Sequence, residues 1–248
     1  MSPQTLPDPL CQLPQKEMQP NNYLSELLSI AAHEFRNPLT TILSSVDLVE
    51  FCELPGQQET RAKHLARIRN AVHELNGLID DFLSLDRLDQ GCVEVRPALF
   101  NLDDFLRELV AEADAVANRN GQQICLSCNG APGICQDPQL LRLILRNLLS
   151  NALKYSREGG RVWLRARVGV RGCRISVADE GIGIPAGSRK SLFGRYFRAE
   201  NAAHIPGTGL GLSIVKRYVD LLQGRVSFRS VENRGSDFIV QLPHRLRA

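Results

Sequence analysis

Two long stretches of regularly spaced apolar residues constrain the fold of this chain more than any other feature. The first begins near Tyr23, and its apolar residues recur close to the helical repeat: Leu24, Leu28, Ala31, Phe35, Leu39, Ile42, Val46 and Val49. The second covers residues 59–88 and alternates steps of three and four: Leu65, Ile68, Val72, Leu75, Ile79 and Phe82. Because the helix-breaking cluster Leu54-Pro55-Gly56 separates them, the two stretches predict an antiparallel helical hairpin over residues 23–92.

A single hairpin of this length has too little core of its own. We therefore expect two copies to pair as a four-helix bundle, which makes the protein a homodimer. Ahead of the hairpin, residues 1–22 carry five prolines among glutamines. This composition is typical of a flexible tail without a fold of its own.

The pattern changes near Ala98, where a second domain is expected to begin and to extend over residues 98–244. Helical stretches at about 101–119, 137–156 and 208–222 alternate there with short β-type runs. These runs are Gln123–Ser127, Arg161–Val168, Cys173–Ala178, Arg225–Ser230 and Asp237–Leu242. The fold class predicted for the chain is thus a helical hairpin followed by an α/β sandwich with a mixed sheet.

Charge and hydropathy exclude some functions. The formal net charge is only +3 and the basic residues form no dense run, so we expect no direct binding to nucleic acid. The sequence has no membrane segment and no signal pattern, so we expect a cytoplasmic chain or the cytosolic portion of a longer protein. The seven cysteines are scattered and lack a second close pair for zinc, which indicates reduced thiols.

His33 is the first candidate for chemistry. It lies about 200° around the first helix from Ala31 and Phe35, and is expected to face solvent. A histidine in this position is usually only solvated. Pro38 favours a functional role for this segment, because a proline inside a helix lowers the stability of the helix by about 3 kcal/mol.

The segment His33-Glu34-Phe35-Arg36-Asn37-Pro38-Leu39-Thr40 resembles the phospho-acceptor box of the sensor histidine kinases of two-component signalling. The resemblance implies phosphorylation of His33 in a dimeric hairpin. The chemistry agrees, because a neutral imidazole is a nucleophile at physiological pH and Glu34 could accept its Nδ1 proton. The pattern Glu34-x-x-Asn37 is also the one linked to phosphatase activity in this family.

A second set of motifs begins with Asn147 and Asn151 in the segment Asn147–Ser156. The two amides lie one helical turn apart and point the same way, where Mg²⁺ with ATP phosphates would supply hard partners. The alternative is that the two asparagines are simply polar residues on the exposed surface of the helix. Further along, Asp179 leaves a strand into a turn with Gly181 and Gly183, and could accept a hydrogen bond from an amino group such as adenine N6. An ordinary strand-to-loop turn would use the same residues.

Two more segments follow in the same domain. Leu192–Arg198 precedes a stretch of small and polar residues up to Ile205, which predicts a mobile lid with Arg198 near a γ-phosphate or simply solvated. Gly207–Leu212 then opens a helix and would present amide N–H groups to phosphate. It is neither a Walker loop nor a Rossmann fingerprint.

Together these four segments resemble the N, G1, F and G2 boxes of the Bergerat-type ATP-binding domain of histidine kinases. The resemblance covers about residues 23–244, and departs from the common pattern at Phe35, Asn37 and Gly194. It implies that Asp179 binds adenine, Tyr155 packs on the ring, and Lys154 and Arg198 contact phosphates. The full ATP set that it implies is Asn147, Asn151, Lys154, Tyr155, Asp179, Gly181, Gly183, Arg198, Gly207, Thr208, Gly209, Leu210, Gly211 and Leu212, with Asn147 and Asn151 also near Mg²⁺.

The expected function is ATP-dependent autophosphorylation at His33, with Glu34 as base, followed by transfer to an aspartate of a response-regulator receiver domain. Residues 41–49 and 62–70 are the expected docking face. One alternative is an ATPase of the gyrase, Hsp90 or MutL kind, but those proteins place a glutamate where this chain has Asn147. The other is a scaffold that only dimerises. The sequence leaves open whether phosphorylation occurs within one chain or between the two.

Overall fold

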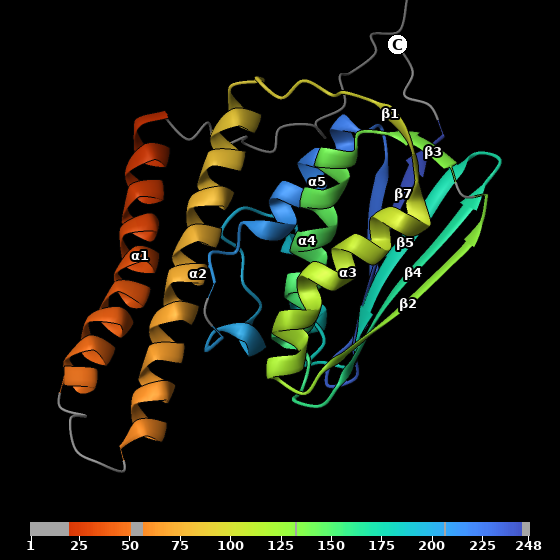
Figure 1. Ribbon diagram of the computed structural model, residues 1–248. Coiled ribbons are helices and arrows are strands. Elements are labelled where there is room, and N and C mark those ends of the chain that lie inside the picture. The colour runs from red at the N-terminus through yellow and green to blue at the C-terminus, as the bar shows by residue number, and fades with distance from the viewer. Residues whose placement is uncertain (1–19, 51–56, 132, 206, 245–248) are drawn as a thin grey trace, which may run out of the picture. The chain divides into compact units, whose positions relative to one another are not determined.

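The computed structural model describes residues 20–50, 57–131, 133–205 and 207–244, except the side chains of 20–31 and 33 (Figure 1). The chain divides into two compact units, residues 1–68 and 69–248, and each is described by itself. Among the described residues, no helix is long and apolar enough to cross a membrane.

The first unit holds helix α1 (Pro20–Glu50) and the start of helix α2 (Gln58–Asp89). The predicted helices are confirmed, but α1 already begins at Pro20, so residues 20–22 do not belong to the predicted tail. Proline is favoured at the first helical position because its missing N–H has no partner there in any case. The remaining tail and the predicted helix end at Leu54–Gly56 lie outside the described residues.

The apolar seam predicted for this hairpin is only partly buried in a single chain. On α1, Leu39 and Val46 are 52% and 38% exposed, whereas Pro38 and Ser45 are buried. Along α2, Leu65, Val72 and Ile79 recur every seven residues and are each about two-fifths exposed. An apolar stripe at heptad spacing is therefore left open.

The second unit is a two-layer sandwich (Figure 1). Its five-stranded sheet has the order β2 (Gln123–Gly130), β4 (Arg161–Gly169), β5 (Gly172–Asp179), β7 (Gly235–Pro243) and β6 (Arg225–Val231). The β2–β4 pair is parallel and the other pairs are antiparallel, so the predicted mixed sheet is confirmed. Helices α3 (Leu102–Arg119), α4 (Pro138–Tyr155) and α5 (Gly211–Leu221) cover one face of this sheet.

Polar caps set where these helices begin. The Asn101 side chain accepts a hydrogen bond from the backbone N–H of Asp103 at the start of α3. Asp137 accepts from the N–H groups of Gln139 and Leu140 at the start of α4. The sequence-based α5 began at 208, which is three residues too early, because Thr208 closes a turn with its Oγ1 accepting from the N–H of Leu210 at 3.2 Å.

A small two-stranded sheet, β1 (Ala98–Asn101) with β3 (Gly133–Gln136), was not predicted. It lies at the entry to the second domain. One short 3₁₀ helix, Ala186–Ser191, precedes the segment Leu192–Arg198, and a second, Glu200–Ala202, lies within the stretch that was expected to form a lid.

Candidate active site

A cavity of about 960 Å³ opens in the second unit, on the helix side of the sheet. Its walls come from α4, the loop after β5, the residue 192–205 segment, the glycine-rich loop and the second half of α2. Its size lies at the upper end of the range typical of small-molecule sites. Twelve of the predicted nucleotide residues line it: Asn147, Asn151, Lys154, Tyr155, Asp179, Gly183, Arg198, Gly207, Thr208, Gly209, Gly211 and Leu212.

The amides of α4 face this cavity because the helix is amphipathic. Leu141, Ile144 and Leu148 are at most 1% exposed and pack into the core, which leaves Asn147 and Asn151 on the opposite side. Asn147 donates from Nδ2 to the Leu143 carbonyl at 3.1 Å, so its Oδ1 is available to the cavity.

Gly211 lies directly against that oxygen. A Cβ at this position would stand 2.7 Å from Asn147 Oδ1, closer than real Cβ atoms approach an oxygen. The glycine at the start of α5 therefore lets the Asn147 amide keep this position, and a larger residue would require the asparagine side chain to move. This contact joins two of the sequence motifs.

Asp179 ends β5 and is 9% exposed. Its Oδ1 accepts a hydrogen bond from the Gly181 N–H at 2.8 Å. Burial raises the pKa of this carboxyl to about 6, although the backbone hydrogen bonds from Gly181 and Ser236 act in the opposite direction. A buried carboxylate with spare acceptor capacity suits an amino group of a ligand.

The loop after Asp179 is held by backbone hydrogen bonds. The Ile182 N–H donates to the Tyr155 carbonyl at 3.2 Å, and the Ile182 carbonyl accepts from the Asn233 N–H at 2.8 Å. Gly183 has a φ of +64°, and a Cβ there would collide with the Val231 carbonyl. Gly181 does not line the cavity; it shapes this loop instead.

Lys154 and Tyr155 lie together at the end of α4. The Lys154 Nζ is 5.2 Å from the centre of the Tyr155 ring, and a Cβ at Gly207 would collide with that Nζ. Burial raises the pKa of the Tyr155 phenol, so the ring is neutral at physiological pH. The pair offers a cation and a flat apolar surface side by side.

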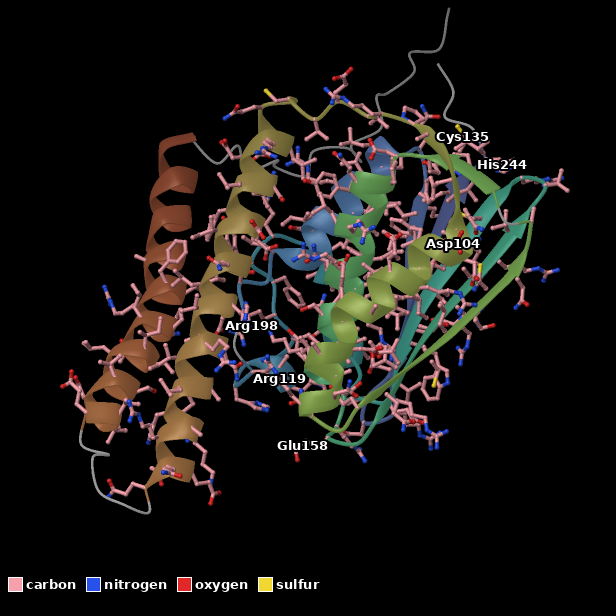
Figure 2. The ribbon with its side chains drawn as sticks, in the orientation of Figure 1. Asp104, Arg119, Cys135, Glu158, Arg198 and His244 are labelled. Atoms are coloured by element: carbon pink, nitrogen blue, oxygen red, sulfur yellow. The ribbon has the colours of Figure 1, made fainter. Side chains whose placement is uncertain are left out.

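Arg198 holds the lid segment together. Its Nη2 donates to the carbonyls of Ala202 at 2.8 Å and Ala203 at 3.0 Å, and also to that of Ile205. Its Nε is buried and has no hydrogen-bond partner among the described residues. Figure 2 shows Arg198 on the side of the domain away from the sheet. The guanidinium thus lines the cavity while bonded to lid backbone.

In the glycine-rich loop, Gly207 and Gly209 have positive φ values of +151° and +70°. Leu210 differs from its neighbours: it is fully buried in the core and anchors the loop rather than lining the cavity.

Two residues that sequence reasoning missed also contact the site. Asn201 Nδ2 donates to the Gly183 carbonyl at 3.0 Å and so ties the lid to the loop after β5.

The other missed residue is Asp81 of α2. Its Oδ2 accepts a hydrogen bond from Thr208 Oγ1 at 3.3 Å, and burial raises its pKa to about 6. Asp81 lies in no recognisable motif. Asn201 lies in the stretch predicted as a lid, where no pattern singled it out.

The predicted phospho-acceptor residues lie in the first unit, on α1. The side chain of His33 is outside the described residues, so its outward orientation stays a prediction. Asn37 is exposed and Glu34 is half-buried. Around the buried Pro38, Thr40 and Thr41 donate from Oγ1 to the backbone carbonyls of residues 36 and 37, at 2.9 and 3.1 Å. Such bonds are common where a helix bends.

Two family models match the chain. Residues 23–91 match the His Kinase A (phospho-acceptor) domain, and residues 136–246 match the histidine kinase-, DNA gyrase B- and HSP90-like ATPase. Together they cover both regions in which the motifs lie.

Similar proteins agree with these matches. The sensor protein GacS of Pseudomonas syringae pv. syringae is 33% identical over 226 residues, which are 88% of this chain and 25% of GacS. The structure of full-length ShkA in complex with AMPPNP is 30% identical, with a TM-score of 0.63 over 90% of this chain and 46% of ShkA. The structure of the histidine kinase ThkA in complex with the response regulator TrrA has a TM-score of 0.64 at 23% identity, over 91% of this chain and 63% of that one. This chain spans about a quarter of the length of GacS.

Proposed function

Because this chain belongs to the sensor histidine kinases of two-component signalling, we propose that it transfers the γ-phosphoryl group of ATP to its own His33 and then to an aspartate of a response regulator. The observation that carries the proposal is the cavity in which twelve predicted nucleotide residues meet, in a chain that also has the His33 motif. In the proposed arrangement, residues 23–92 accept the phosphoryl group and form the dimer, while residues 98–244 bind ATP.

Each end of the nucleotide has matching groups in the cavity. The buried Asp179 accepts a hydrogen bond from the adenine amino group, and the Tyr155 ring packs on the base. Lys154 and the N–H groups of the glycine-rich loop bind phosphates. Arg198 reaches the γ-phosphate once the lid carbonyls release it, so ATP binding and lid rearrangement are coupled. AMPPNP in the ShkA complex supports a nucleotide of this type.

Mg²⁺ fits the donor set on α4. Asn147 offers a free amide oxygen one turn from Asn151, and amide oxygens are the hard ligands that Mg²⁺ accepts. No cluster of three or more His, Cys, Asp or Glu that could hold a metal exists among the described residues. The ion would therefore depend on phosphate oxygens and on these two amides, and it would neutralise phosphate charge.

The acceptor chemistry needs little from the protein beyond positioning. The imidazole of His33 attacks the γ-phosphorus in line while Glu34 takes up its Nδ1 proton and orients the ring. The phosphorus–nitrogen bond forms as the bond to the β-γ bridging oxygen of ATP breaks, and ADP leaves. The same mechanism operates within one chain or between the two chains of a dimer.

A homodimer is supported by the open apolar stripe of α2. Leu65, Val72 and Ile79 remain about 40% exposed in one chain, as expected of side chains that a second copy would cover. The ThkA complex with TrrA supports a receiver domain as the second partner.

The proposed location is the cytoplasm, where ATP is available.

We further propose that the chain dephosphorylates its partner, with the exposed amide of Asn37 orienting a water toward the phospho-aspartate. An Asn37→Ala variant should retain autophosphorylation and lose the phosphatase activity. Unchanged dephosphorylation of the partner would contradict this role.

Incubation with γ-labelled ATP tests the main proposal. A histidine kinase yields labelled protein whose label is labile in acid and stable in alkali. Release of phosphate without labelled protein would instead indicate an ATPase, and binding without turnover a scaffold. Subsequent addition of a set of receiver domains identifies the partner by the rate at which label moves from the chain.

A further inference from the structure

The two faces of the five-stranded sheet differ in what covers them. On β4, Val162, Leu164 and Ala166 point toward helices α3, α4 and α5 and belong to the core. The alternate residues point the other way, where no described element packs on the sheet (Figure 1). We call this second side the open face; it consists of the outward-pointing residues of β2, β4, β5, β7 and β6.

The open face is strongly basic. Six arginines point outward from three of its strands, β4, β5 and the edge strand β6: Arg161, Arg165, Arg167, Arg174, Arg225 and Arg229. Asp237 is the one carboxylate at the outward positions of these five described strands. No ion pair found among the described residues involves any of the six. Nitrogen-tipped side chains project from this side of the sheet (Figure 2).

Arg229 lies opposite Asp237, but the row formed by Arg167, Arg174 and Arg225 is unfavourable for the folded protein alone. Arg167 and Arg174 are direct cross-strand partners, and like charges in such positions repel each other. Arg225 lies in the same row, separated from Arg174 only by Gln241. The hairpin tip adds Arg171. A solvent-facing sheet surface normally mixes both signs of charge, so this row indicates an anionic partner.

Two apolar features accompany the charge. Trp163, the one tryptophan of the chain, lies half-buried on the open face with the Arg165 guanidinium 5.3 Å from its ring centre. Val170 at the tip of the β4–β5 hairpin is 98% exposed, next to Arg171 and close to Arg167 and Arg174. An aromatic ring and a projecting aliphatic side chain among arginines are suited to the interface between lipid headgroups and acyl chains.

We propose that the open face binds the surface of an anionic lipid bilayer. Strands β4, β5 and β6 present their guanidiniums to lipid phosphates, while Val170 enters the headgroup region and Trp163 lies at its border. A nucleic acid or an acidic peptide would match the charge but would have no use for the exposed valine. None of the six arginines lines the nucleotide cavity, so the cavity stays accessible when the open face is bound.

Vesicle co-sedimentation of the full chain tests this proposal. Binding is expected to vesicles of phosphatidylglycerol and phosphatidylcholine but not to phosphatidylcholine alone, and to weaken as salt is raised. The triple variant Arg167→Gln, Arg174→Gln, Arg225→Gln should weaken binding about 100-fold, at about fivefold for each arginine. Val170→Ser should weaken it about fivefold without any change of charge.

The control removes the same charge from exposed positions on helices. Arg87→Gln, Arg107→Gln, Arg119→Gln should bind like the unaltered chain, and the open-face variant should unfold at the same or a higher temperature because it relieves the Arg167–Arg174 repulsion. Trp163 emission should shift to the blue with anionic vesicles only.

Each opposite outcome overturns the proposal: no sedimentation with anionic vesicles at low salt, equal loss in both triple variants, an unchanged Trp163 spectrum, or no effect of Val170→Ser. Stronger binding of an oligonucleotide, with the same dependence on the three arginines, would assign the open face to nucleic acid instead.

Discussion

The helix that carries the proposed phospho-acceptor and the cavity proposed to bind nucleotide hold their predicted site residues in different ways. On α1, His33, Glu34 and Asn37 belong to one short helical segment, and only Pro38 among the described residues nearby is buried. In the cavity, residues from several elements are held by close contacts, such as Gly211 against Asn147. The difference indicates that the proposed acceptor residues form a local motif, whereas the proposed nucleotide site depends on packing across the second domain.

The largest effect is expected where a glycine holds the cavity loop in a left-handed conformation. Gly183→Ala places a Cβ against the Val231 carbonyl at a positive φ and should lower the free energy of unfolding by about 3 kcal/mol. Denaturant titration measures it. Gly187→Ala is the matched control, because no atom lies within 4 Å of its Cβ position, and it should change little. Equal effects of the two would mean that the loop is not tightly held.

The next effect concerns Asp179, where binding and stability should change in opposite directions. Asp179→Asn removes the acceptor and should weaken ATP binding by about 2 kcal/mol, some 30-fold, as seen by calorimetry. Because burial raises the pKa of Asp179 from 3.8 to about 6, its ionised form opposes folding. The wild-type carboxyl therefore favours folding fully below about pH 4, and this contribution is lost as pH rises through 6.

Asp179→Asn should consequently raise the melting temperature relative to wild type at pH 8, with the difference shrinking as pH falls toward 4. Wild-type ATP affinity should itself decline as pH falls through 6, when the carboxyl becomes protonated. A variant less stable than wild type at pH 8 would contradict a desolvated Asp179.

The smallest effect is expected on the acceptor helix. Pro38→Ala restores a backbone donor to α1 but removes a buried ring. The free energy of unfolding should therefore rise by about 1 kcal/mol, which is less than the roughly 3 kcal/mol that a proline costs inside a helix. ATP affinity should stay the same. Denaturation followed by circular dichroism measures the stability, and nucleotide titration measures the ATP affinity. A changed ATP affinity would contradict the view that the two regions are independent.

Sequence reasoning succeeded where a single element carries the signal. The spacing of Asn147 and Asn151 on an amphipathic helix predicted that both point the same way, and both line the cavity. Asp179 was recognisable at the end of a strand. It failed where tertiary packing decides. Asp81 reaches Thr208 from a helix distant in sequence. Strand β1 has only four residues, too few for a periodic pattern to appear.

Residues that support the cavity and residues that line it were also hard to distinguish from the sequence pattern. Leu210 and Gly181 lie inside recognisable motifs, yet one anchors the loop in the core and the other shapes a turn beside the cavity. Only the packing of the surrounding side chains distinguishes these roles from direct contact.

The most direct test of the central claim compares His33→Ala with His64→Ala, a matched change at a half-buried histidine of α2. Both variants should bind ATP like wild type, since neither residue belongs to the proposed ATP-binding set. With γ-labelled ATP, wild type and His64→Ala should acquire acid-labile, alkali-stable label, and His33→Ala should acquire none. Label that persists in His33→Ala would contradict the assignment of His33 as the phosphoryl acceptor.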